Sequence, residues 1–168
     1  TNFFKNNLYA SIVNSSISAI KKSVLKNVNG FDLNLRSGQD TDFWIRIALN
    51  YKVALHNIVT GIYIKNDESL SNSKSVKERI KFLNKFTHLE TTNKGLKSYM
   101  DMNRYSVAIY YKILNEDTIS QSIYDAICKD NLSLKQRLIY NLPLFLLKPL
   151  YSLKKSLDKK GLFLNLYR

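Results

Sequence analysis

The spacing of apolar residues changes near residue 73, and this change constrains the fold more than any other feature of the sequence. Before it, runs rich in β-branched residues favour extended strands, with short helical stretches between them. After it, apolar residues recur every three or four positions, which is typical of amphipathic helices. We therefore predict an α/β part over residues 1–72 and a mainly α-helical extension over residues 73–168.

Local signals place the starts and ends of the helices in the extension. The segments Ser75–Glu78 and Ser133–Gln136 have the pattern of capping boxes, which satisfy the first N–H groups of a helix. The last helical region is expected to be kinked or broken near Pro143 and Pro149, because proline cannot donate the helical hydrogen bond. No apolar run approaches the length of a membrane-spanning helix.

Composition limits the classes of partner and cofactor. The chain has 26 Lys and Arg against 13 Asp and Glu, which indicates an anionic partner such as a nucleic acid, a membrane surface or a phosphorylated substrate. The single Cys128 excludes an internal disulfide and a multi-cysteine metal site, and it is compatible with a reducing cytosol. His56 and His88 are too few and too far apart for a histidine zinc motif. Because the chain opens in an apolar segment without an initiator Met, we expect it to be part of a longer protein.

Acidic residues are scarce, yet three of them lie near the only tryptophan, in the stretch NGFDLNLRSGQDTDFWIRIALNYKV. On a helix that starts near Asp40, Asp40 lies beside Trp44 and Asp42 lies beside Arg46, because residues four apart share a face. In one interpretation the carboxylates suit the helix dipole, Asp42 pairs with Arg46, and Trp44 belongs to the core. In the other, Asp40 accepts a proton from a nucleophile and Trp44 offers a face on which a sugar or base can stack.

An ordered series of motifs surrounds this cluster. The segment SSISAIKKSVLKNVNGFDLNLRSGQDTDFWIRIALNYKV, with the later YIKNDESLS, resembles the second half of the catalytic domain of inverting glycosyltransferases of family two. The match covers about residues 10–73. It implies the acceptor-side half of a GT-A fold. It also implies that the full-length protein transfers a sugar from a nucleotide-sugar donor to a glycan or lipid-linked acceptor with inversion, in the synthesis of a surface polysaccharide.

The resemblance also implies roles for individual residues. Asp40 takes the position of the family's general base. Asn66 stands where the family often has a histidine that assists the metal, so it would be a weak ligand. The donor-binding half, with the Asp-x-Asp motif that holds Mg²⁺ or Mn²⁺, is not recognised in this chain, so the chain alone is expected to be inactive. The positions matched to substrate binding or positioning are Asp42, Trp44, Arg46, Asp32, Ser16 and Ser18.

A basic, leucine-rich tail covers residues 129–168. It could be a packed helix with a solvated basic face, or an interfacial helix whose lysines meet anionic lipid. Nucleic-acid binding is a weaker alternative, because the nearby tyrosines follow a helical core pattern and no known nucleic-acid motif is present. A non-catalytic helical interaction module is a further alternative. We expect a cytoplasmic protein, with peripheral attachment to the inner face of the membrane.

Overall fold

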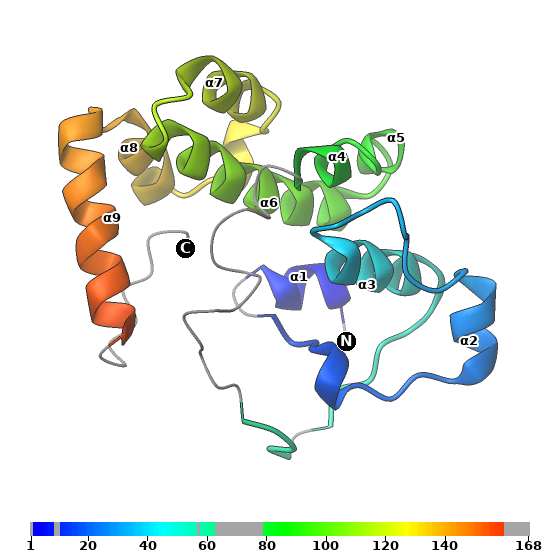
Figure 1. Cartoon of the computed structure of the whole chain (residues 1–168). Helices are drawn as coiled ribbons and strands as arrows, with labels where there is room; N and C mark the ends of the chain where they lie inside the picture. Colours follow the sequence, from blue (N-terminus) through cyan, green and yellow to red (C-terminus); the bar gives the residue numbers. More distant parts are fainter. Residues whose placement is uncertain (1, 9–10, 57, 63–78, 160–168) are drawn as a thin grey trace. The chain divides into compact units, whose positions relative to one another are not determined.

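In a computed structural model of the chain, residues 2–8, 11–56, 58–62 and 79–159 are described (Figure 1). Their regular structure is helical, and no β-strand occurs among these described residues. The prediction of an α/β first part, the acceptor-side half of a GT-A fold, is therefore wrong. Helices expected after residue 73 are present where that part of the chain is described.

The chain divides into two compact units, Thr1–Leu96 and Lys97–Arg168. Helix α6 (Lys94–Ile113) begins at the end of the first unit and is the longest helix of the second. The boundary predicted between residues 72 and 73 lies within 63–78, outside the described residues, as does the capping box predicted at Ser75–Glu78.

The first unit is built around helix α3 (Gln39–Asn50), whose apolar side chains Phe43, Trp44, Ile45 and Ile47 are buried. A Cβ atom at Gly38 would lie 3.4 Å from the ring of Phe82, so the start of α3 lies against α4. The other described helices of this unit are short: α1 (Phe3–Asn7), η1 (Ser15–Ile17, a 3-10 turn), α2 (Lys22–Asn27), α4 (Arg79–Leu83) and α5 (Thr87–Glu90).

The expected strands do not form among the described residues, because these segments have no neighbouring strand with which to form hydrogen bonds. Ser18 and Tyr51 have the extended backbone of a strand, with φ, ψ of −109°, 135° and −138°, 152°. A sheet also requires a ladder of N–H to C=O bonds between adjacent strands, and none forms among the described residues. Some of the β-branched residues that suggested strands are instead exposed; Val59 and Ile62 are examples. Pairing with a neighbour, and not residue type alone, decides whether a strand exists.

The second unit packs α6 against four shorter elements: α7 (Asp117–Asp125), η3 (Lys129–Asn131), α8 (Leu134–Asn141) and α9 (Leu144–Lys159). The predicted capping box at Ser133 is confirmed: the Gln136 N–H donates to Ser133 Oγ at 3.2 Å, and the Ser133 N–H donates to Gln136 Oε1 at 2.7 Å. The core of this unit consists of Tyr105, Ala108, Ile109, Tyr124, Ile127, Leu132, Ile139, Tyr140 and Leu147.

Two tyrosines join α7 to α8. The rings of Tyr124 and Tyr140 stack with centroids 3.6 Å apart and planes 5° apart. Lys129 Nζ lies 3.5 Å from the Tyr124 centroid and Lys112 Nζ lies 4.7 Å from that of Tyr140, so a cation faces each tyrosine ring. Burial lowers the pKa of both lysines and raises the pKa of both tyrosines. The stack is therefore part of the core and not an open aromatic surface.

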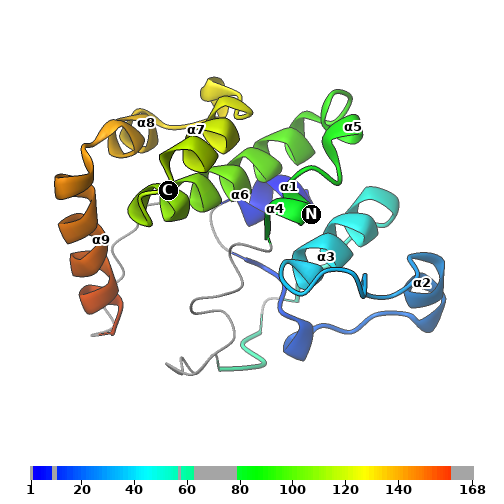
Figure 2. The same cartoon turned by 45° about the horizontal axis from the view of Figure 1, so that its top comes forward.

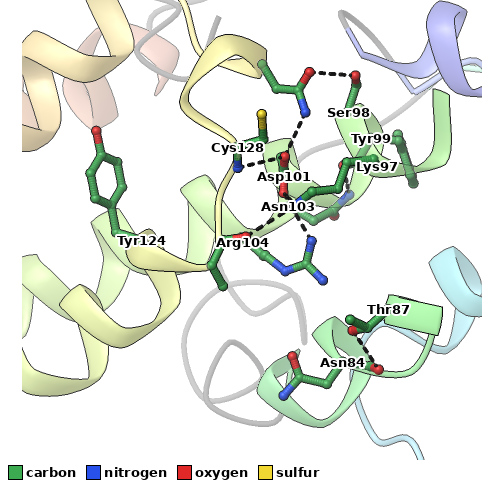
Figure 3. Close-up of polar contacts among 12 residues, drawn as sticks. Asn84, Thr87, Lys97, Ser98, Tyr99, Asp101, Asn103, Arg104, Tyr124 and Cys128 are labelled. Atoms are coloured by element: carbon green, nitrogen blue, oxygen red, sulfur yellow. Dashed lines mark hydrogen bonds and ion pairs between the residues drawn. The ribbon is translucent and has the colours of Figure 1, made fainter. Parts of the chain in front are cut away.

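A buried carboxylate on α6 fixes the loop between α7 and α8. Figure 3 shows Asp101 facing Lys97 and Arg104 on its own helix, with Lys97 Nζ 2.5 Å and Arg104 Nη1 3.1 Å away. The Cys128 N–H donates to Asp101 Oδ2 at 3.1 Å, and Asn131 Nδ2 donates to the same oxygen at 2.7 Å. Asp101 thus attaches the 128–131 segment to α6 through both charge and hydrogen bonds.

Helix α9 leaves this core. The chain breaks between α8 and α9 at Pro143, as expected, but α9 continues through Pro149. Leu147 is buried in the core, whereas the later part of α9 extends beyond α6, α7 and α8 in both views (Figures 1 and 2). Among the described residues no helix is both long and apolar enough to cross a membrane.

Candidate functional site

The predicted acidic cluster lies at the start of α3. Gly38 precedes the helix with φ of 83°, a left-handed conformation that glycine adopts without strain. Asp40 and Asp42 both lie in the first turn, where the helix dipole favours a carboxylate. The two differ in environment, because Asp40 is exposed and Asp42 is fully buried. Within the described residues the Asp40 side chain makes no ion pair.

Asp42 is surrounded by cations. Arg46, one turn later, approaches Asp42 Oδ2 with Nη2 at 2.7 Å and Nε at 2.9 Å. Lys85, which follows α4, places Nζ 2.6 Å from Asp42 Oδ1. That contact is an ion pair by distance, although its angles fall outside those of a hydrogen bond. Both oxygens of Asp42 are thus engaged, and the residue is a buried anchor of the unit.

Arg46 also holds the glycine turn that precedes α3. Its Nη1 donates to the Val28 carbonyl, and its Nη2 donates to the Gly30 carbonyl at 2.7 Å. Asn29 and Gly30 have φ of 57° and 60°, so the backbone turns sharply here and directs both carbonyls to the guanidinium. The planar fork of arginine suits this arrangement, because it can serve a carboxylate and two carbonyls at once.

The residues after this turn also pack onto α3. The rings of Phe31 and Phe43 lie 4.4 Å apart between centroids. Asp32 Oδ2 lies 2.7 Å from Lys85 Nζ, and Asp32 Oδ1 accepts the Asn34 N–H at 3.0 Å. The hydrogen bond from Lys85, followed by that from Asn34, lowers the pKa of Asp32 below 3.8. Lys85 therefore bridges Asp32 and Asp42, two carboxylates ten positions apart in sequence.

The pKa of Lys85 reflects two opposed effects. Burial by itself would lower the pKa, because it disfavours the charged ammonium. The contacts of the ammonium with the carboxylates of Asp32 and Asp42 outweigh that effect and raise the pKa above 10.5. Lys85 is consequently a permanent cation of this site at neutral pH.

Three of the remaining predicted site residues have contacts with other residues. Trp44 is buried and packs on Phe43 with centroids 5.3 Å apart, so it belongs to the core and offers no open stacking face. Ser16 and Ser18 both form hydrogen bonds with Asn14. The Ser16 N–H donates to the side-chain oxygen of Asn14, and the Ser18 hydroxyl donates to the backbone carbonyl of Asn14. Asn66 lies outside the described residues.

Sequence reasoning missed Lys85 and the role of the carbonyls that Arg46 binds. Lys85 is 43 positions after Asp42, and no local pattern pairs the two. The Arg46 contacts had a partial signal, because the Asn29-Gly30 pair before α3 indicates a sharp turn with exposed carbonyls.

The described residues do not fit a divalent metal. Carboxylate oxygens are the ligands that Mg²⁺ and Mn²⁺ prefer, and a site requires several of them free. Asp32 and Asp42 are instead paired with Lys85 and Arg46. Among the described residues no group of three or more His, Cys, Asp or Glu side chains is placed to hold a metal.

Comparison with known protein families, with curated proteins and with solved structures finds no match to this chain.

Proposed function

We propose that this chain supplies the acceptor-side base of an inverting sugar transfer, with Asp40 as the base. The donor would be a nucleotide sugar, and the acceptor a glycan or lipid-linked glycan in the synthesis of a surface polysaccharide. The observation that carries this proposal is the packing of the glycine turn on α3. Two of the segments that carry the glycosyltransferase resemblance, residues 29–32 and 40–46, are held together by Arg46 and by the Phe31–Phe43 contact. The proposal concerns this turn and helix and does not require a β-sheet.

The proposed chemistry uses one carboxylate. The acceptor hydroxyl gives its proton to Asp40 as its oxygen attacks the anomeric carbon of the donor sugar. The new C–O bond forms as the bond to the diphosphate breaks, and the nucleoside diphosphate leaves with that electron pair. Attack opposite the leaving group inverts the anomeric configuration. Asp40 suits this role because it is the exposed member of the pair Asp40 and Asp42.

Asp42, Arg46 and Asp32 are positioning residues in this proposal. They fix the start of α3 against the glycine turn, so that the Asp40 carboxylate has a defined place relative to an acceptor that enters beside the turn. No step is assigned to a metal, because the described residues do not provide its ligands. The proposal places the protein in the cytoplasm, where it would act at the inner face of the membrane.

The product of the reaction tests this proposal. The full polypeptide that contains residues 1–168 is incubated with UDP-, GDP- and dTDP-linked sugars and lipid-linked glycan acceptors, and the new linkage is examined by NMR. We expect a product whose anomeric configuration is opposite to that of the donor. A product with retained configuration, or no transfer from any of these donors, contradicts the proposal.

A further inference from the structure

Helix α9 carries an apolar face that is exposed in the described part of the chain. Phe145, Leu146 and Leu153 are 73%, 47% and 53% exposed, whereas Leu147 on the opposite side is 1% exposed. With about 3.6 residues per turn, Phe145, Pro149 and Leu153 follow one another along one face at intervals of four, and Leu146 and Leu153 are seven apart. We call this set, Phe145, Leu146, Pro149 and Leu153, the α9 stripe.

Lysines lie along the edge of the α9 stripe. Lys148 and Lys155 are exposed and seven positions apart, so they share one side of the helix next to the stripe. Between residues 129 and 158 the chain has six basic residues and two acidic residues, Asp130 and Asp158, so this part of the chain is basic. An apolar face with flanking cations is the pattern of a helix that lies in a membrane interface.

Helix α8 repeats the same chemistry on a smaller scale. Leu134 and Leu138, four positions apart, are 76% and 69% exposed, and Lys135 between them is also exposed. These two leucines of α8 would add apolar area to a contact with a membrane interface. The exposure of both helices follows from their position at the end of the second unit, where α9 extends beyond α6 and α7 (Figure 2).

We propose that α9 docks this protein on an anionic lipid surface, with the α9 stripe in the headgroup boundary and with Lys148 and Lys155 at the lipid phosphates. The charge of the chain favours an anionic lipid surface as the partner. The chain has a net charge of +13, and each basic residue held near an anionic membrane strengthens binding. The stripe adds a contribution that salt does not screen. The proposal uses no residue of α3, so it holds or fails independently of the sugar-transfer proposal.

A nucleic acid is a poorer fit to the same surface. Single-stranded nucleic acids bind to basic grooves in which aromatic side chains are free to stack on bases. Four tyrosines of this unit are not free to stack on bases, because Tyr105 and Tyr111 are buried and Tyr124 and Tyr140 stack on each other. The exposed side chains of the α9 stripe are aliphatic except for Phe145. They favour a hydrocarbon boundary over bases.

Vesicle co-sedimentation of the full chain tests the proposal. Vesicles of phosphatidylcholine alone and with phosphatidylglycerol are compared at low and physiological salt. Replacing Lys148 and Lys155 with Gln is expected to weaken binding to the anionic vesicles by at least about tenfold. The change F145S/L146S/L153S is expected to weaken it by about tenfold or more, including at the higher salt concentration. Far-UV circular dichroism checks that each variant remains helical.

Matched controls separate α9 from the general charge and hydrophobicity of the chain. The control for the stripe is L33S/V59S/I62S, whose parent side chains are 94%, 89% and 88% exposed in the first unit. The control for charge replaces the exposed Lys22 and Lys52 with Gln. Both controls should bind the anionic vesicles within about twofold of the parent chain, since neither changes α9.

Several results would overturn the proposal. Equal binding to neutral and anionic vesicles would remove the role of charge, and a serine variant that binds like the parent chain would remove the role of the stripe. If the control variants lose as much affinity for the anionic vesicles as the α9 variants do, the docking surface is not on α9. Binding of a labelled RNA, lost in the Lys148 and Lys155 variant while vesicles are not bound at all, would assign the basic face to nucleic acid.

Discussion

At the scale of single residues, carboxylates that look alike in the sequence have different surroundings. Asp40 and Asp42 are two positions apart, and the helical period places one on the solvent side of α3 and the other in the interior. The sequence predicted the i, i+4 pair of Asp42 and Arg46, and the structure confirms it. The sequence could not predict the contact of Lys85 with Asp42. A contact between residues 43 positions apart depends on how α4 packs and not on any local pattern.

The bridge from Lys85 to Asp32 predicts a pH dependence. Lys85 lowers the pKa of Asp32 in the folded protein, so this ion pair stabilises the fold above the unfolded-state pKa, about 3.9. That stabilisation is lost as the pH falls through the lower, folded-state pKa. Replacing Lys85 with Met should therefore raise the pKa of Asp32, which carboxyl ¹³C chemical shifts during an acid titration would measure.

The control for this titration is Lys81→Met, which removes an exposed lysine of α4 and should leave the pKa of Asp32 unchanged. The free energy of unfolding gives a second readout: the difference between the parent chain and Asp32→Asn should be present at neutral pH and shrink below about pH 4. An Asp32 pKa that is the same with and without Lys85 would show that the ion pair does not form in solution.

At the scale of elements, local chemistry predicted helices well and strands poorly. The capping box at Ser133 specifies a helix start by two hydrogen bonds within four residues, so neighbours are not required. A strand has no such self-contained bond, because its partners are always elsewhere in the chain or in another chain. The segment that contains Val59 and Ile62 satisfied the residue preferences of a strand and lacks the partner among the described residues.

The attachment of the 128–131 segment to α6 predicts a large effect at one buried residue. Asp101→Asn removes the carboxylate charge that faces Lys97 and Arg104 and should lower the free energy of unfolding by about 3–5 kcal/mol. Exchange of the Cys128 amide, which donates to Asp101, should become faster. Urea denaturation followed by circular dichroism and hydrogen exchange would measure the two effects.

Asp130 provides the comparison, since its carboxylate is 95% exposed and lies 3.7 Å from Arg137. Asp130→Asn should change the free energy of unfolding by less than about 0.5 kcal/mol, as is usual for exposed ion pairs. Equal effects at Asp101 and Asp130 would mean that Asp101 is not the anchor of this segment.

At the scale of the whole molecule, the two units carry different proposals. The first unit holds the α3 site, and the second presents the lysines and the exposed stripe of α9. The sequence predicted the basic, amphipathic character of the last part because charge and helical period are local properties. Which face of α9 is exposed could be decided only from the structure, since leucines lie on both sides of that helix and only Leu147 is fully buried among them.

The rate of sugar transfer by the full polypeptide tests directly whether Asp40 is the base. Asp40→Asn should lower kcat by about 10²–10⁴ with the donor Kd unchanged, because a base acts in the transition state and not in donor binding. Asp117→Asn, at a first-turn position of α7 that is also exposed, should leave kcat unchanged. Asp42→Asn should lower kcat less than Asp40→Asn. Equal and mild losses at Asp40 and Asp42 would contradict the claim and leave both carboxylates as stabilising residues of α3.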